Sequence, residues 1–465
     1  MVQLFVELAK YIMIILFAIY TYECFAVFRG NDKKKQEKRF RRQSRMLYMI
    51  HFVANMVILS VTRELSLFIL YVAEIVLFVT IQNSYRMFYP KASRLLANNM
   101  CMLMMIGFVI LTRIDSARAI KQFAIAAASS IICLIIPVMI RRMKFFRNLT
   151  WLYGVIGVLA LAVVWIAGST SYGAKISFTI AGITIQPSEF IKILFVFYVA
   201  AMFYRSTEFH QLVITTVMAA AHVLILVLSK DLGSALIFFV AYLAMVYVAT
   251  KRVSYFVAGL AAGSVASVIA YKLFSHVQTR VLAWKAPLTV IDNEGYQICQ
   301  SLFAIGTGGF FGMGLYQGSP KKIPKVVQDF VFSAIAEEMG VIFALCLILV
   351  CISCFLMFFN IAMQLKDEFY KLVALGLGCV YGIQVFLTLG GVTKFIPSTG
   401  VTLPLVSYGG SSLLSTLIIF GIVQGLYILR EDEGEANYEE TESKPKEKQR
   451  KKTAFDTDIE DFNKK

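Results

Sequence analysis

The sequence predicts an all-α integral membrane protein, a polytopic bundle of helices that crosses the bilayer many times. Of its 465 residues, 58% are hydrophobic and 14% are aromatic, and the mean hydropathy is +0.71. Soluble domains are about 45–50% apolar and do not sustain apolar runs of twenty residues. The apolar blocks are continuous, whereas a membrane β-barrel needs short segments of alternating polarity. Backbone groups in lipid must be satisfied within the span, so continuous blocks indicate helices.

Thirteen apolar segments are long enough for a membrane span, which takes roughly 20 residues. Their expected ranges are about 2–27, 46–62, 65–81, 96–112, 121–140, 150–168, 187–204, 211–229, 232–250, 253–273, 327–359, 369–390 and 400–429. The first segment is too long for a signal-peptide core and no basic region precedes it, so we expect a retained span.

These spans divide the chain into three parts. Residues 1–95 form an N-terminal transmembrane extension of about three helices, and residues 96–430 form a transmembrane core of ten. Residues 431–465 mix acidic and basic blocks with almost no apolar side chains. Such a segment buries too little surface to fold alone, so the tail is predicted to be disordered.

The positive charge of the chain, formally +16, is concentrated between the spans. The stretch 29–45 alone holds nine Lys or Arg residues, and smaller clusters lie at 141–147 and 251–252. Basic loops stay on the cytoplasmic side and attract anionic membrane lipid. The pattern therefore predicts a multi-pass protein of the cytoplasmic membrane, with a basic cytoplasmic loop at 29–45, the N-terminus outside and the tail inside. It argues against a nucleic-acid partner.

The cysteines and histidines carry no metal-binding pattern. Nearly all eight cysteines lie within apolar spans, where a free thiol behaves as a small hydrophobic group. Cys351 and Cys354 have the C-x-x-C spacing, but no second ligand pair accompanies them. We interpret the cysteines as structural.

A polar stretch at 274–325 interrupts the apolar pattern and, by the charge alternation, lies outside the cell. It contains Arg280, Trp284, Lys285 and Asp292, and then a glycine-rich run at 306–314. The glycine run follows no strand, so a dinucleotide site is not expected. Turns or close backbone approach explain the glycines better.

Charged residues inside membrane helices are costly and are therefore functional candidates. Glu189 and Lys192 are three residues apart on one helical face. Either they form an internal ion pair that fixes helix packing, or they line a cavity for an anionic headgroup. Lys230 and Asp231 begin another span, and Asp329 begins a third.

Residues 399–412 form a further polar segment, rich in Gly, Pro and Ser. Irregular backbone at membrane depth is tolerated only beside protein or a water-filled cavity. We therefore expect this segment and the three charged helix ends to converge on one cavity near the outer face.

These polar blocks resemble the SEDS family of bacterial cell-wall polymerases, the FtsW/RodA/SpoVE group. The blocks are 186–189, 231–233, 296–338 and 397–412. The run Leu-Pro-Leu-Val-Ser-Tyr-Gly-Gly-Ser-Ser at 403–412 is the most specific of them. The resemblance covers about 97–429, which leaves the first three helices as an extension.

The resemblance implies a peptidoglycan glycosyltransferase. It would polymerise lipid II, the undecaprenyl-pyrophosphate-linked disaccharide-peptide, at the outer membrane face during division, elongation or sporulation. A class B penicillin-binding protein would be its partner and would crosslink the new glycan. A divalent cation, Mg²⁺ or Mn²⁺, is compatible with this chemistry as a cofactor.

The chemistry assigns roles to the polar residues. A sugar hydroxyl must lose a proton as it attacks, so a carboxylate is needed as general base. Asp292 is the candidate. The departing pyrophosphate needs cations, for which Arg280, Lys285 and Lys394 are candidates. From the other blocks, the resemblance adds five candidate substrate-binding residues: Glu189, Lys192, Asp329, Ser407 and Tyr408.

The chain departs from the family pattern at specific positions. The family aspartate lies six residues before the tyrosine, where this chain has Val290. Asp292, four residues before Tyr296, is the nearest carboxylate. The family's His-Thr-Asp is Val327-Gln328-Asp329 here, without the histidine.

Two other functions remain open. One is a transporter that moves lipid II across the bilayer, which intramembrane charges would serve equally well. The other is an inactive scaffold that recruits cell-wall enzymes, which the departures from the family pattern make plausible.

Overall fold

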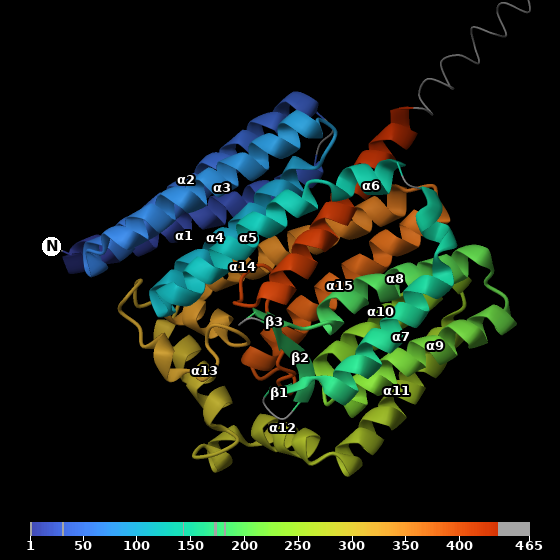
Figure 1. Cartoon of the computed structure of the whole chain (residues 1–465). Helices are drawn as coiled ribbons and strands as arrows, with labels where there is room; N and C mark the ends of the chain where they lie inside the picture. Colours follow the sequence, from blue (N-terminus) through green and yellow to red (C-terminus); the bar gives the residue numbers. More distant parts are fainter. Residues whose placement is uncertain (1, 30–31, 143, 172–173, 181–182, 436–465) are drawn as a thin grey trace, which may run out of the picture.

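The computed structural model describes residues 2–29, 32–142, 144–171, 174–180 and 183–435, and they form a helical bundle (Figure 1). The helices are α1 Val2–Ala26, α2 Lys33–Thr62, α3 Leu65–Phe88, α4 Arg94–Ile114, α5 Ser116–Cys133, α6 Ile136–Arg142, α7 Thr150–Ala167, α8 Ser188–Arg205, α9 Phe209–Leu228, α10 Leu232–Thr250, α11 Val253–Leu273, α12 Ser275–Lys285, α13 Tyr296–Gly308, α14 Val331–Gln364, α15 Glu368–Val392 and a last helix, Gly410–Glu435. Short 3₁₀ turns are η1 Val27–Arg29, η2 Lys144–Asn148, η3 Pro287–Val290 and η4 Pro320–Lys322.

The all-α membrane fold is confirmed. Twelve helical stretches among the described residues are long and apolar enough to cross a membrane, and every predicted span falls on a helix. The remaining span is α8, a helix of 18 residues that carries Glu189, Lys192 and Arg205. Because it carries these three charged residues, α8 is not among the twelve stretches that are apolar enough by composition alone.

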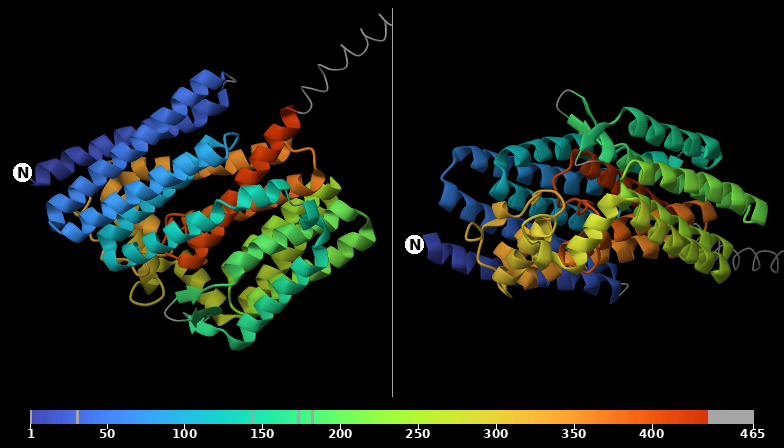
Figure 2. Two further views of the ribbon diagram at one scale, coloured as in Figure 1. Left: turned by 45° about the horizontal axis from the view of Figure 1, so that its top comes forward. Right: turned by 90° about the horizontal axis from the view of Figure 1, so that it is seen from below.

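The first three helices lie on one flank of the bundle. Helix α1 packs against α2 and α14, and α2 packs against α4. Both views of Figure 2 keep these N-terminal helices, in blue, on the same flank. The extension is therefore packed onto the remaining helices.

The basic stretch 29–45 was predicted as a loop, and that prediction was wrong. Helix α2 begins at Lys33, with the Asp32 carboxylate accepting hydrogen bonds from the Lys34 and Lys35 amides. An aspartate at this position satisfies the free amides of a first turn. Arg39 and Arg42 then pair with the buried Glu23 of α1, so the basic charge lies on a helix rather than in a connection.

Three other expected boundaries also change. The span 121–140 is divided between α5 and α6, and the helix expected from residue 400 begins at Gly410. Before it, Gly400 and Leu405 have φ angles of 74° and 66°, which a helix cannot contain. The tail, predicted to be disordered from 431, is helical to Glu435, and residues 436–465 lie outside the described residues.

Helix α14 is interrupted at Gly340, where φ is 86°. The glycine-rich run fills the break: the Met313 amide donates to the Glu337 carbonyl at 3.0 Å, and the Val341 amide donates to the Gly309 carbonyl at 2.9 Å. A Cβ at Gly312 would lie 2.4 Å from the Glu338 carbonyl oxygen. Close backbone approach therefore explains the glycines, and their hydrogen bonds satisfy the interrupted helix.

A small antiparallel sheet, not predicted from the sequence, connects α7 and α8. Its strands are β1 Ser169–Ser171, β2 Ala174–Ile180 and β3 Ile183–Ile185, in the order β1-β2-β3. The register pairs Ser169 with Ser177 and Phe178 with Ile185. Figure 1 places the sheet at the same end of the bundle as α12 and α13.

Candidate functional site

The candidate site lies at this end, where α8 and α10 begin and the non-helical part of the polar segment, residues 399–409, passes between the helices. Asp231 precedes α10, and its carboxylate accepts hydrogen bonds from the Ser234 amide at 3.1 Å and the Ser188 hydroxyl at 3.2 Å. Gln186 adds a weaker contact at 3.4 Å. Burial raises the pKa of Asp231, and the hydrogen bonds from Ser234 oppose that rise. The starts of α8 and α10 are thus joined through one carboxylate.

Arg280 and Asp329 face each other across Gly400. A Cβ at Gly400 would lie 3.6 Å from Asp329 Oδ2 and 3.9 Å from an Arg280 guanidinium nitrogen. The same guanidinium donates to the Thr399 carbonyl at 3.2 Å. Glycine is favoured here because its φ is 74°, a conformation that side chains rarely adopt, whereas both charged groups are at ordinary contact distance.

The charges of this pair are shifted by their surroundings. Burial lowers the pKa of Arg280, while Asp329 and Asp231 oppose this. Burial raises the pKa of Asp329, and the cations Lys325 and Arg280 oppose that rise. Both side chains keep some exposed surface. The site therefore combines low dielectric with an opening to solvent, the setting in which perturbed pKa values mark functional candidates.

Two polar atoms near Arg280 are buried without a hydrogen-bond partner. They are Thr399 Oγ1 and His276 Nε2. Burial, followed by the charges of Arg280 and Lys230, lowers the pKa of His276, so its ring is neutral at pH 7. Buried polar groups are normally satisfied, so a buried polar atom without a partner is a candidate for contact with water, an ion or a substrate. These atoms are therefore free to contact a polar ligand.

Glu189 and Lys192 lie deeper, inside the bundle. The Lys192 ammonium donates to Glu189 at 2.6 Å and to the Gln384 side chain at 2.8 Å. The Ser415 hydroxyl donates to the same Glu189 oxygen at 3.0 Å. Both charged side chains are buried. The pair connects α8, α15 and the last helix, which agrees with the ion-pair interpretation; contact with a substrate stays a prediction.

Ser407 and Tyr408 fix the polar segment to the chain ahead of α14. The buried Ser407 hydroxyl donates to the Gln328 carbonyl at 2.5 Å, and the Tyr408 amide donates to the Val327 carbonyl at 2.7 Å. This places Asp329 beside the segment. The guanidinium of Arg118 lies 5.7 Å from the Tyr408 ring centroid. Ser407 therefore helps to position the backbone next to Asp329. Contact of Ser407 or Tyr408 with a substrate stays a prediction.

Lys285 and Lys394 lie together in a pocket that does not include Arg280. Both line it together with Cys299 and Phe303, and the Trp284 indole donates to the Lys394 carbonyl at 3.1 Å. Lys394 itself has a φ of 60°, as do few residues other than glycine. The structure thus separates the predicted cations into two groups, with Arg280 in one and both lysines in the other.

Asp292 lies in the turn between η3 and α13. Its side chain is exposed, and no hydrogen bond or ion pair joins it to another described residue. The carboxylates whose charges act on Arg280 are Asp329 and Asp231, and Asp292 is not among them. Asp292 as base stays a prediction.

Sequence reasoning passed over Lys325, whose charge acts on Asp329, and His276, on which Arg280 and Lys230 act; it noted Lys230 only as a charged helix start. Lys325 and Lys230 have φ angles of 55° and 64°, and strained backbone of this kind clusters at functional sites. No residue spacing indicated them, since their neighbours at the site come from distant parts of the chain. Among the described residues, no three His, Cys, Asp or Glu side chains form a metal cluster.

Comparison with known proteins gives this geometry a context. The model of the cell cycle protein family FtsW/RodA/SpoVE matches residues 93–431. Peptidoglycan glycosyltransferase RodA of Mycobacterium tuberculosis is 36% identical over 299 residues, 61% of this chain and 64% of that protein. The chain thus matches slightly less than two thirds of the length of that relative.

RodA of Mycobacterium leprae is 32% identical over 75% of this chain and 80% of its own length. A chain from a solved structure, described as the structural coordination of polymerization and crosslinking by a peptidoglycan synthase complex, shares the fold with a TM-score of 0.62. It is 24% identical, and the match covers 73% of this chain and 98% of that one.

Proposed function

Because the chain belongs to the FtsW/RodA/SpoVE family of cell cycle proteins, we propose that it is a peptidoglycan glycosyltransferase that polymerises lipid II. The observation that supports this best is the opening around Arg280, Asp329 and Asp231. It presents a guanidinium, carboxylates with raised pKa and orphan polar atoms at one end of a membrane bundle. A substrate with a lipid tail and a pyrophosphate headgroup has matching chemistry.

Each part of the reaction needs a group of this kind. The attacking sugar hydroxyl must pass its proton to a carboxylate, and a raised pKa brings a carboxylate closer to the working pH. The pyrophosphate gains negative charge as it departs, and a guanidinium in a poorly solvated site stabilises that charge strongly. We assign this second role to Arg280, with Lys285 and Lys394 binding more distant parts of the substrate.

Two carboxylates are candidates for the base. Asp292 is the loop carboxylate nearest to the family position, and we retain it as the first proposal, which requires the loop to move on substrate binding. Asp329 is the second candidate, favoured by its place beside Arg280 and by its raised pKa. Initial polymerisation rates of Asp292→Ala and Asp329→Asn separate the two. Full activity in Asp292→Ala assigns the base elsewhere.

A divalent cation remains a proposal for this site. Mg²⁺ is usually held by one or two carboxylates together with phosphate oxygens of the substrate. Asp231 and Asp329 would supply such ligands, and the cation would neutralise charge on the pyrophosphate. Polymerisation in chelator, and again after Mg²⁺ or Mn²⁺ is restored, tests this. Equal rates in both conditions contradict a metal requirement.

We further propose a class B penicillin-binding protein as partner. An apolar groove on α10, α14 and α15 is lined by Ile352, Phe355, Gly382 and Phe386, and apolar side chains of one partner membrane helix would cover it. We expect Ile352→Trp, which enlarges an exposed side chain of the groove, to reduce co-purification of that partner at least tenfold, while Val265→Trp at an exposed position of the neighbouring α11 leaves it unchanged. Unaltered co-purification of Ile352→Trp contradicts this surface.

The termini are proposed to lie on opposite sides of the membrane, the N-terminus outside and the C-terminus in the cytoplasm. Basic residues support this, because Arg39, Arg141 and Arg252 lie at the ends of helices remote from the site. Reporter fusions to each terminus test the orientation. A cytoplasmic N-terminal reporter contradicts it.

The whole proposal is tested with purified protein, its co-purified partner and lipid II in liposomes. Glycan polymer supports it. Movement of the lipid II headgroup without polymer supports the transporter instead.

The inactive scaffold is favoured by Val290 at the family aspartate position and by the exposure of Asp292. Normal growth of cells that carry Asp292→Ala and Asp329→Asn together would support that scaffold.

A further inference from the structure

The N-terminal extension contains a basic groove far from the candidate site. Its walls are α2 and α3: Arg41, Ser44, Arg45 and Tyr48 come from the first helix and Val79, Gln82, Asn83 and Arg86 from the second. Gln82 and Arg86 also line a neighbouring pocket that reaches Arg94 and Asn98 at the start of α4. The two spaces therefore share two lining side chains and together involve three helices.

The groove lies at the end of the bundle opposite the site. Lys91, in the turn that leads into α4, pairs with Asp432 near the end of the last helix at 2.7 Å. That helix begins next to the site, where the Ser411 hydroxyl accepts a hydrogen bond from the Gln186 amide. The length of the last helix therefore separates the groove from the opening around Arg280.

The charge of the groove is unbalanced. Arg41 and Arg94 both contact Glu37, at 2.9 Å and 3.1 Å. Arg45 and Arg86 are exposed and have no ion-pair partner among the described residues. Two arginines thus face the same space without a neutralising carboxylate, and guanidinium groups are well suited to bind phosphate oxygens.

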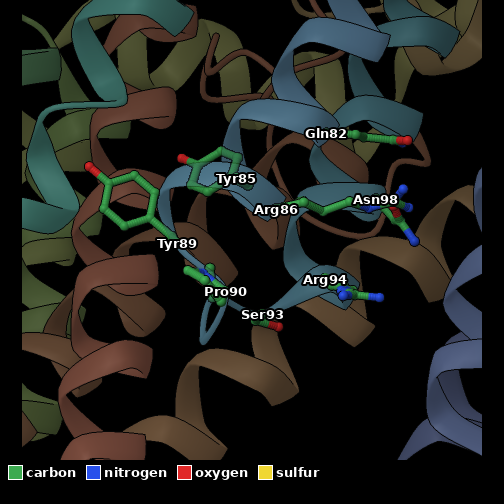
Figure 3. Close-up of a pocket in the computed structure, with 10 residues that line it drawn as sticks. Gln82, Tyr85, Arg86, Tyr89, Pro90, Ser93, Arg94 and Asn98 are labelled. Carbon is green, nitrogen blue, oxygen red and sulfur yellow. The ribbon is translucent and has the colours of Figure 1, made fainter. Parts of the chain in front are cut away.

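A polar side chain forms the floor. Gln82 is 6% exposed, and its Oε1 accepts a hydrogen bond from the Tyr48 hydroxyl at 3.2 Å. Its Nε2 has no hydrogen-bond partner of acceptable geometry; only the thiol of Cys101, a weak acceptor, lies close. Figure 3 shows the Arg86 side chain extending toward Asn98, between those of Gln82 and Arg94. A buried donor without a partner is costly, so an acceptor in the groove would stabilise it.

The surface next to the groove is apolar and faces the membrane. Phe52 follows Tyr48 by four residues on α2, and Val76 precedes Val79 by three on α3, so both continue the groove along the helices. Phe52 is 51% exposed and Val76 is 58% exposed. A free phosphate ion would leave this surface unused, whereas an acyl chain would cover it.

We propose that this groove binds the phosphate-bearing headgroup of an anionic phospholipid, with an acyl chain along Phe52 and Val76. Arg45 and Arg86 bind the phosphate, and Gln82 Nε2 donates to one of its oxygens. Basic pockets between helices at a membrane surface are known sites for such headgroups. The lipid would contact α2, α3 and α4, and so would connect the extension to the helices of the core.

The test uses full-length protein purified in detergent and titrated with phosphatidylglycerol, with native mass spectrometry counting bound lipids. We expect one lipid to bind at least tenfold more tightly than phosphatidylcholine. The double variant Arg45→Ala/Arg86→Ala should weaken this binding roughly 25-fold, from about fivefold per basic residue near a membrane surface. Gln82→Leu should weaken it severalfold while preserving the side-chain volume.

The matched control is Arg205→Ala/Arg252→Ala, which removes two exposed arginines at the same end of the bundle. It should bind phosphatidylglycerol as the wild type does. Equal affinity of the Arg45→Ala/Arg86→Ala variant and this control overturns the proposal. If millimolar inorganic phosphate displaces the lipid, the proposal that a phospholipid occupies the groove is overturned, because the ion alone would then be a sufficient ligand. Gel filtration and melting temperature verify that each variant is folded.

Discussion

Two acid–base pairs in this protein have the same charges but different surroundings. Glu189 and Lys192 are buried in the bundle, with Gln384 and Ser415 as additional partners. Arg280 and Asp329 lie at the end of the bundle, in partial contact with solvent, beside unpartnered Thr399 and His276 atoms. The first pair is complete without a ligand and the second is not. Charge at membrane depth therefore does not identify a site by itself; unsatisfied hydrogen bonding and access distinguish the two.

The largest expected effect separates the pairs by activity. Asp329→Asn keeps the size of the side chain and removes its charge, so we expect the initial rate of glycan polymerisation to fall by about 100-fold or more. The melting temperature in detergent should not decrease, because a neutral amide is less costly to bury than a carboxylate. A rate within twofold of wild type would remove Asp329 from the site.

The inner pair should respond in the opposite way. Glu189→Ala leaves the Lys192 charge buried without its partner, which typically costs about 3–5 kcal/mol of stability. The double variant Glu189→Leu/Lys192→Met removes both charges and should recover most of that loss. Thermal unfolding in detergent measures both. If the double variant polymerises glycan at the wild-type rate, the pair is structural; a folded double variant without activity would instead indicate substrate contact.

The smallest expected effect is on the pH dependence of stability. Burial raises the pKa of Asp329 above its ordinary value of 3.8, so the folded protein binds more protons than the unfolded chain between the two values. The free energy of unfolding is therefore greatest at a pH below the pKa of Asp329 in the unfolded chain. It decreases as the pH rises through the raised pKa of the folded protein, by up to about 1.4 kcal/mol per unit of difference between the two pKa values. Asp329→Asn should reduce this slope, and Asp231→Asn should reduce it independently. An unchanged slope in both variants contradicts the burial of these carboxylates.

Much of the fold follows from the sequence because hydropathy is a local property. Each span needs only about twenty neighbouring apolar residues, so the thirteen spans could be located without tertiary information. Helices α12 and α13, inside the polar stretch 274–325, were not predicted. The helix boundaries were less certain. At 29–45 the density of charge indicated a loop, whereas the Asp32 cap and the Glu23 pairs with Arg39 and Arg42 make it helical. The polar blocks were likewise sufficient to indicate the family.

The site was only partly predictable. Arg280 and Asp329 were both selected, but their approach across Gly400 joins three segments that are far apart in the chain. Asp231 was noticed as a charged helix start, and its hydrogen bond with Ser188 appears only when α8 and α10 pack together. Lys325 and His276 gave no signal, because their importance lies in what surrounds them.

By itself, the sequence determined that this protein is a helical membrane protein, where its spans lie and which family it resembles. These conclusions depend on residues close in the chain or on recognisable blocks. Only the tertiary structure decided which charges are paired, which remain open to a ligand and where the glycine-rich run fills the break in α14. The physical reason is that hydrogen-bond satisfaction and desolvation depend on all neighbours in space, and helix packing brings those neighbours together from distant segments.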